Sequence, residues 1–174
     1  EHHDADISKT GQVFLPGANG NPYGNQPAIK YTVKVTSDGT TVVNVNDTVE
    51  GSAVTLDTTN WTAVSNKGTT ITPSFNEKGF SLNNQSLQDG EEVTITYWGK
   101  VDTSKIDNLL NVTYNETGNK VTLTGDNIPE KEVTHYEHEV GVNNLSKSST
   151  DVSAIDENGL QTVTWKIVAN SNPL

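Results

Sequence analysis

The stretch Val42-Val43-Asn44-Val45-Asn46-Asp47-Thr48-Val49 is the most informative segment for predicting the fold of this chain. Its apolar residues Val43, Val45 and Val49 alternate with polar ones, a pattern that predicts a β-strand with one buried face. Asp47 is in phase with the valines, so its carboxylate is expected to face the core. An unpaired buried carboxylate is energetically costly. We therefore expect other groups of the chain to share this site with Asp47.

Alternation of the same kind recurs along the sequence and predicts an all-β protein. Many short strands with closely spaced turn signals are typical of an Ig-like β-sandwich, here of about 7–10 strands with Greek-key connections. Helical periodicity is absent except for one possible short turn within 103–110. The expected strands span 5–9, 29–36, 42–49, 53–56, 61–64, 69–75, 79–82, 91–101, 109–114, 120–124 and 132–142.

Composition and charge exclude several classes of function. The formal net charge of −11 argues against nucleic-acid partners and against an anionic membrane surface. The absence of cysteine excludes disulfides, thiol chemistry and thiolate metal sites. No signal peptide or membrane-inserting segment is recognisable, so the chain is either cytosolic or a mature fragment of an exported protein. No nucleophile-elbow, phosphate-loop or dinucleotide-binding motif is present, so we expect neither a cofactor nor an enzyme acting on a separate substrate.

Two other groups of side chains suggest sites only weakly. In His135-Tyr136-Glu137-His138, a strand would put His135 and Glu137 on one face and His138 on the other, which suits a single metal ion poorly. We expect these side chains to be solvated and no metal to bind. Val93, Ile95 and Tyr97 of 91–101 alternate and are expected to face inward. Trp61, Trp98 and Trp165 are expected to pack in the core or on a sheet face, with Trp98 the candidate for exposure because it is out of phase with Tyr97.

The end of the chain repeats the pattern of its beginning. Leu145-Ser146-Lys147-Ser148 matches Ile7-Ser8-Lys9-Thr10, and 163–169 matches the alternation of 29–35. Tandem units of this size are typical of elongated arrays. We therefore predict one module over 1–142, with 143–174 forming the opening strands of a second repeat or a strand-exchange segment. Uncovered apolar strands need a partner, so this segment is expected to pack on the first module or on a neighbouring molecule.

A series of motifs in a fixed order suggests a family. They are Lys-Thr-Gly at 9–11, Ile-x-Tyr-x-Val-x-Val at 29–35, Asn-Val-x-Asp-Thr-Val at 44–49, Gly-Phe-x-Leu at 79–82, Glu-Val-Thr-Ile-Thr-Tyr at 92–97 and Leu-x-Asn-Val-Thr-Tyr-Asn at 109–115. In this order they resemble the Ig-like modules of Gram-positive surface adhesins and pilin backbone subunits, especially the collagen-adhesin type. The resemblance covers residue 7 to about 142. It implies an extracellular, cell-wall-anchored structural module whose partners are neighbouring repeats.

The resemblance also implies a self-formed isopeptide bond. Carried over by position, Lys9 is the amine, Asp47 is the acid that promotes the reaction, and Asn111 is the acceptor amide. Asn115 is the alternative acceptor, because the buried face of 109–114 is ambiguous. Lys34 is a rival amine, but it is out of phase with Val33 and Val35 and is expected on the outer face.

The physical chemistry of Lys9 and Asp47 agrees with that expectation, since both have core parity. Burial raises the pKa of a carboxyl and lowers that of an amine, and a neutral amine is a nucleophile. A protonated carboxyl can polarise an amide carbonyl and shuttle protons, and folding supplies the proximity. Three simpler interpretations stay open: the two residues form a buried ion pair, Lys9 extends to solvent, or Asp47 caps a turn.

Two other functions remain beside a structural stalk. One is an adhesin domain that recognises a host matrix protein or glycan, and the other is a carbohydrate-binding accessory module. A large exposed aromatic patch or groove would favour binding, whereas a uniformly polar Thr- and Asn-rich surface favours the stalk.

Overall fold

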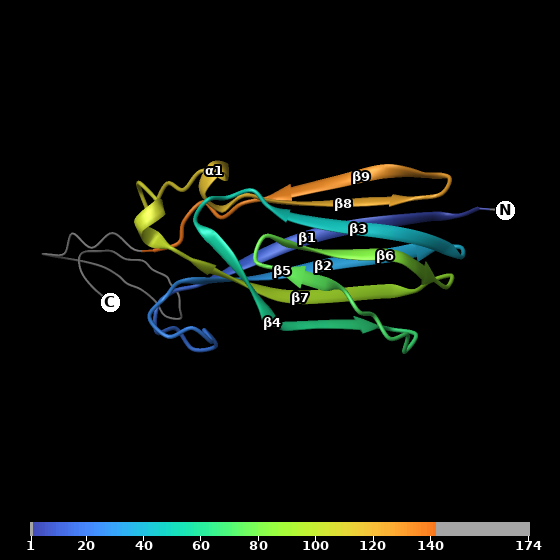
Figure 1. The fold of residues 1–174 in the computed structure, drawn as a ribbon, viewed down its shortest axis with the longest axis horizontal. Helices are drawn as coiled ribbons and strands as arrows, with labels where there is room; N and C mark the ends of the chain where they lie inside the picture. The colour runs from blue at the N-terminus through green and yellow to red at the C-terminus, as the bar shows by residue number, and fades with distance from the viewer. Residues whose placement is uncertain (1, 142–174) are drawn as a thin grey trace, which may run out of the picture.

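The computed structural model describes residues 2–141, and its strands form two antiparallel sheets packed face to face. This confirms the predicted all-β sandwich. The molecule is elongated, with the N-terminus at one end and the last described residues at the other (Figure 1). The elements are β1 (Asp4–Phe14), β2 (Ala28–Asp38), β3 (Thr41–Val49), β4 (Val54–Ser65), β5 (Ser74–Asn76), β6 (Gly79–Leu87), β7 (Glu92–Val101), a 3₁₀ turn η1 (Thr103–Lys105), α1 (Tyr114–Thr117), β8 (Asn119–Gly125) and β9 (Ile128–His135).

Strand order places β3 in the middle of its sheet. One sheet has the order β1-β2-β7-β4 and the other β5-β6-β3-β8-β9. Asp47 lies opposite Phe80 of β6 on one side and opposite Val121 of β8 on the other. Its side chain therefore enters the core from a central strand, with the β1–β2–β7 sheet facing it.

The predicted alternation in β2 and β3 is confirmed. Tyr31 and Val33 of β2 are fully buried, as are Val43 and Val45 of β3, and Asp47 is only 5% exposed. Burying each of these valines stabilises the fold by about 1.5–3 kcal/mol. Since alternate residues of a strand point to opposite faces, the same phase that buries the valines also fixes the carboxylate inside.

Several expected strands differ from the observed ones. The two segments predicted at 53–56 and 61–64 form one strand, β4, with a register shift between Leu56 and Trp61. The segment 109–114 is not a strand: it leads into α1, which begins with a capping box between Thr113 and Glu116. A Thr followed three residues later by Glu satisfies two free backbone N–H groups and so favours a helix start over a strand. β9 ends at His135 and not at 142.

The outer face of the first sheet carries Trp98, which is 9% exposed. The prediction that it packs on a sheet face is confirmed, and the alternative that it is exposed is wrong. The rings of Phe14 and Tyr23 pack against it, with centroids 5.0 and 6.0 Å away. The Asn21 amide fixes this covering loop by donating to the carbonyls of Phe14, Leu15 and Gln26.

The gap between the edge strands β1 and β9 is bridged by Lys131. Its ammonium lies 3.1 Å from Asp4 Oδ1 and 3.2 Å from Asp6 Oδ1, and it donates to the carbonyl of Ala5 at 2.6 Å. These contacts tie the first strand of one sheet to the last strand of the other. Within 2–141, no helix is long and apolar enough to cross a membrane. The predicted second repeat at 143–174 lies outside the described residues.

Candidate functional site

Lys9, Asp47 and Tyr97 meet in the interior of the sandwich. Lys9 Nζ donates to Asp47 Oδ2 at 3.1 Å, and both side chains are fully shielded from solvent. The Tyr97 hydroxyl lies between them: it accepts a hydrogen bond from Lys9 Nζ and donates one to Asp47 Oδ2. The structure thus brings together the predicted amine and acid. It adds a phenol that the sequence analysis placed in the core without a chemical role.

Each member of this cluster comes from a different strand. Lys9 is on β1, Tyr97 on β7 and Asp47 on β3 of the opposite sheet. The rings of Tyr31 and Tyr97 stack with centroids 5.1 Å apart, and Lys9 Nζ lies 4.3 and 4.7 Å from those centroids. Aromatic faces attract a cation and pack against an aliphatic stem, so the two rings hold the lysine in the core.

A buried asparagine, Asn119, completes the site. β8 pairs with β3 so that Asn119 lies opposite Val49, and Val121 lies opposite Asp47. Asn119 and Asp47 are therefore diagonal neighbours on the inner face, within reach of each other's side chains. Asn119 is 0% exposed, and neither its amide nitrogen nor its oxygen has a well-formed hydrogen bond.

Unpartnered polar atoms gather around Asn119. Besides its own two amide atoms, Asp47 Oδ1 and the Tyr31 hydroxyl are buried without a hydrogen bond. Each such atom costs about 1–3 kcal/mol. Four such atoms therefore lie beside the buried ion pair, and the Asn119 amide is close enough to influence Asp47, Tyr31 and Tyr97 electrostatically.

The electrostatics of the pair favour its neutral form. Burial raises the pKa of Asp47, against the opposing effects of Lys9, Tyr97 and Asn119, which lower it. Burial likewise lowers the pKa of Lys9, with Asp47 acting in the opposite direction. Both shifts favour an uncharged amine beside a carboxylic acid. The arrangement therefore places an amine, a carboxylic acid and an amide carbonyl together in the core, shielded from solvent.

The predicted acceptor, Asn111, is not part of this site. It is exposed in the loop between η1 and α1, where its backbone N–H donates to the carbonyl of Asn108, and Asn115 is exposed on α1. The structure brings neither to Lys9, because 109–115 is not a strand of the sandwich. The sequence signal for Asn119 was its phase with Val121 and Leu123, the same argument that placed Asp47 in the core. Lys34 is exposed and lies 3.6 Å from Glu92, which confirms its outer position.

In the histidine-rich segment, His138 is exposed as expected, whereas His135 and Glu137 are partly buried, contrary to the expected solvation. His135 Nε2 lies 2.5 Å from Glu137 Oε2, and both side chains fill the space above Gly11, where a Cβ atom would lie 2.4 Å from the Glu137 carboxylate. Within 2–141, no group of three or more His, Cys, Asp or Glu side chains is arranged to hold a metal ion.

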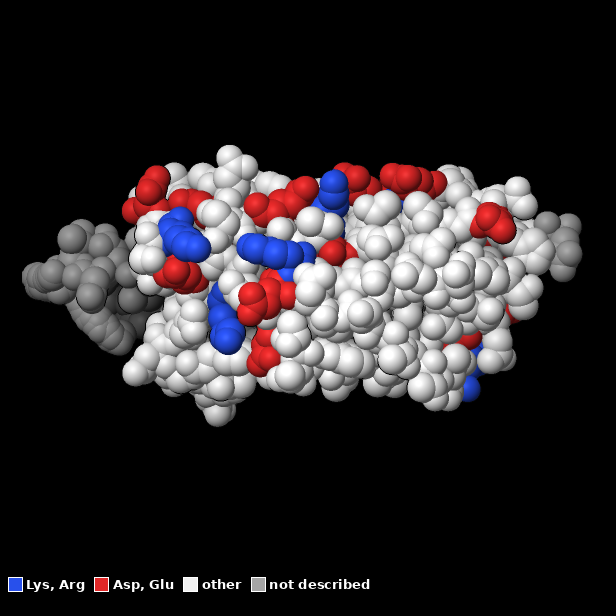
Figure 2. All heavy atoms as spheres, in the orientation of Figure 1, with Lys and Arg blue, Asp and Glu red and all other residues white. Residues whose placement is uncertain are grey.

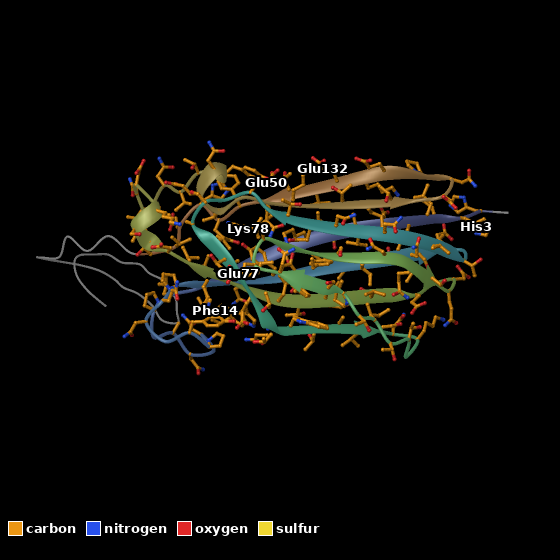
Figure 3. All side chains as sticks on the ribbon, viewed as in Figure 1. His3, Phe14, Glu50, Glu77, Lys78 and Glu132 are labelled. Atoms are coloured by element: carbon orange, nitrogen blue, oxygen red, sulfur yellow. The ribbon has the colours of Figure 1, made fainter. Side chains whose placement is uncertain are left out.

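An open hollow of about 580 Å³ lies at the N-terminal end of the sandwich, where Figure 3 labels His3. It is formed by the start of β3, the turn after β6 and the turn after β8, and it shares no residue with the buried cluster. Its lining residues are His3, Thr40, Thr41, Val42, Thr69, Ser86, Leu87, Gln88, Glu91, Asp126 and Asn127.

Comparison with known proteins gives no sequence match and a distant structural likeness. No protein-family model matches this sequence, and no curated protein sequence matches it. Among solved structures, the chain is similar to the full-length RrgB pilus protein from Streptococcus pneumoniae, at 13% identity and a TM-score of 0.45. That alignment covers 72% of this chain and 23% of the pilus protein.

Proposed function

We propose that this chain is a structural stalk module of a bacterial cell-surface adhesin or pilus-like fibre, stabilised by a self-formed amide bond between Lys9 and Asn119. The observation that carries the proposal is the fully buried Lys9–Asp47 pair beside an asparagine whose amide has no hydrogen-bond partner. Asn119 takes the place of Asn111 as the acceptor, because it is the asparagine that β8 presents to Asp47.

The reaction is an intramolecular aminolysis that needs no cofactor. The neutral Lys9 Nζ attacks Cγ of Asn119, while the protonated Asp47 carboxyl hydrogen-bonds the amide and polarises it. The Nζ–Cγ bond forms, the Cγ–Nδ2 bond breaks, and Nδ2 leaves as ammonia after gaining the proton that Nζ gives up. The Asp47 carboxyl is protonated before and after the reaction. It acts only once in each molecule, because Lys9 and Asn119 are consumed.

The product also relieves the energetic cost of the site. The lysine nitrogen becomes an uncharged amide, so the core no longer holds a buried ammonium. The new amide N–H has Asp47 as an adjacent acceptor. In a chain without cysteine, the bond would have the stabilising role that a disulfide has elsewhere.

A Lys9–Asn119 bond would connect β1 to β8 and enclose residues 10–118 in a covalent loop. The N-terminus and the last described residues lie at opposite ends of the molecule (Figure 1). Tension applied to those ends would pass from β1 through the bond to β8 and bypass the enclosed residues. This geometry suits a module that must bear load without extending.

The surface supports a stalk better than a binding domain. Within the described residues, the exposed large hydrophobic side chains are Val42, Val64 and Leu110, which come from separate elements. Much of the face shown in Figure 2 is uncharged, with acidic side chains along the edge formed by β8 and β9. There is no large exposed aromatic patch among them to receive a glycan or a matrix protein.

Single-molecule stretching from the two ends of the chain tests this proposal. The wild type is expected to show no extension from the 10–118 loop, whereas Asn119→Ala should release roughly 360–390 Å of contour length. Asn111→Ala is the matched control and should behave as the wild type does. Full extension of the wild-type chain would overturn the proposed load path.

A further inference from the structure

The two carboxylate oxygens of Asp47 have different surroundings. Oδ2 receives hydrogen bonds from Lys9 Nζ and from the Tyr97 hydroxyl. Oδ1 is buried and has no hydrogen-bond partner. Asn119 is the neighbouring side chain on the same face of the sheet, and its amide is also without one. The carboxyl is therefore divided into one oxygen that faces the amine and one that is free to meet the amide.

We propose that Tyr97 is a catalytic residue of the cross-linking reaction, which fixes Asp47 Oδ2 as the proton acceptor for Lys9 and leaves Oδ1 as the acid for Asn119. This inference rests on the proposed function, since it assigns a role in the same bond-forming step. Tyr97 touches the reacting nitrogen directly, because its hydroxyl oxygen accepts a hydrogen bond from Lys9 Nζ.

The proton balance follows from that division. An oxygen that already accepts two hydrogen bonds is the poorer place for the acid proton, so the proton of the neutral carboxyl resides on Oδ1. As Nζ attacks Cγ, it gives a proton to Oδ2, either directly or through the Tyr97 hydroxyl. Oδ1 gives its proton to Nδ2, which leaves as ammonia. The carboxyl regains one proton for the one it donates, and nothing is consumed besides the two side chains that join.

Charged and titratable neighbours of Asp47 come from each element around it. They are Lys9 on β1, Tyr31 on β2 and Tyr97 on β7, while Glu137 acts on Tyr31 from the segment after β9. Burial raises the pKa of Asp47, and the Tyr97 hydrogen bond opposes that rise. Removing the phenol should therefore raise the pKa of Asp47 further. The Asp47 carboxyl of that variant should therefore stay protonated up to a higher pH than in the wild type.

Timed refolding of Tyr97→Phe tests the inference. The full-length chain is purified unfolded in denaturant so that it is unreacted, refolded at a series of pH values, and quenched at intervals for intact mass. Folding is followed separately by tryptophan fluorescence. Since positioned proton transfer contributes roughly 10²–10⁴-fold, we expect bond formation in folded Tyr97→Phe to be at least about tenfold slower. The alkaline limb of its pH–rate profile should lie at higher pH than in the wild type.

Two further variants separate a catalytic role from a structural one. Tyr23→Phe also removes a phenol that donates to a carboxylate, that of Asp57 at 2.7 Å, but on the outer face of the first sheet. It should cross-link at the wild-type rate. Replacing Tyr97 by 3-fluorotyrosine keeps the ring and strengthens the donor, and should move the alkaline limb to lower pH.

The outcomes distinguish the two proposals. A cross-linking rate within twofold of the wild type in folded Tyr97→Phe would overturn the role of Tyr97. So would a slower rate with an unmoved alkaline limb, because a purely structural defect predicts that result. A wild-type chain that refolds and keeps its full mass would overturn the proposed function, and with it this inference.

Discussion

Position 47 would cost the fold less free energy if it were a fourth inward valine of β3. The strand instead holds a carboxylate at 5% exposure, with a fully buried lysine against it. Replacing buried ion pairs by apolar residues is often neutral or stabilising, so burial alone does not explain this pair. The proposed bond to the adjacent Asn119 would explain it, because the reaction would leave no charge on the lysine.

The acceptor can be identified by exchanging single asparagines. Asn119→Ala should retain the full unreacted mass, since Lys9 has no amide to attack. Asn111→Ala and Asn115→Ala should each cross-link normally, because both side chains are exposed outside the core. Intact mass spectrometry under denaturing conditions reads each variant. Loss of the bond in Asn111→Ala with retention in Asn119→Ala would show that the acceptor inferred from the sequence was right.

Residue phase predicted more of the site than the motif resemblance did. Lys9, Asp47 and an inward Tyr97 follow from alternation alone, and the structure confirms their burial. Asn119 has the same signal, but the resemblance directed attention to Asn111, which looked like strand sequence. The different roles proposed for Asp47 Oδ1 and Oδ2 had no signal in the sequence. It depends on hydrogen bonds between strands that are 38 to 88 positions apart.

At the scale of elements, the position of Asp47 in the core depends on the close approach of β6 to β3. A Cβ atom at Gly79, whose φ is +156°, would lie 1.9 Å from the Asp47 carbonyl oxygen. Gly79→Ala must therefore push the two strands apart at the position that holds the acid. We expect it to lower the free energy of unfolding by more than the roughly 1–2 kcal/mol that a left-handed residue costs. We also expect it to slow cross-linking.

Gly68→Ala provides the comparison, because Gly68 also has a positive φ, +79°, but a Cβ there meets no atom within 4 Å. It should cost only the backbone strain and leave the cross-linking rate unchanged. Urea unfolding measures the first effect and timed intact mass the second. Equal effects of the two substitutions would show that the approach of β6 to Asp47 does not matter.

The Lys131 bridge between β1 and β9 should stabilise the fold in a pH-dependent way. The pKa of Asp4 is lowered by the backbone N–H of Ala5 and by Lys131. A folded-state pKa below the unfolded value contributes stability that is complete above the ordinary pKa near 3.8 and is lost as pH falls through the folded value. In thermal unfolding at pH 7, Lys131→Met should therefore have a lower Tm than the wild type. The difference should shrink in acid, and a difference that stays constant would argue for packing instead of charge.

Element boundaries were predicted less well than elements. The alternation of β2 and β3 gave their faces correctly because one face of each is buried. The helix start at Thr113 was missed because a four-residue helix has too few turns to show periodicity. Trp98 was expected to be exposed because the loop that covers it, with Phe14 and Tyr23, is irregular and leaves no repeating pattern in the sequence.

For the whole molecule, a bond across residues 10–118 should dominate stability. Closing a loop of about 100 residues stabilises a fold by roughly 4–5 kcal/mol, chiefly by restricting the unfolded chain. The double variant Lys9→Met/Asp47→Leu removes the bond without leaving a charge in the core. We expect its free energy of unfolding in guanidinium to fall by about that amount. A double variant as stable as the wild type would show that the loop is not closed.

The measurement that tests the central claim most directly is the intact mass of the purified wild-type chain, followed by peptide mapping. The account predicts a mass about 17 Da below that of the sequence, from the loss of ammonia. It also predicts one branched peptide that joins Lys9 to Asn119, and the full mass in Asp47→Ala. A folded wild-type chain with its full mass, or a branch at any other asparagine, would contradict it.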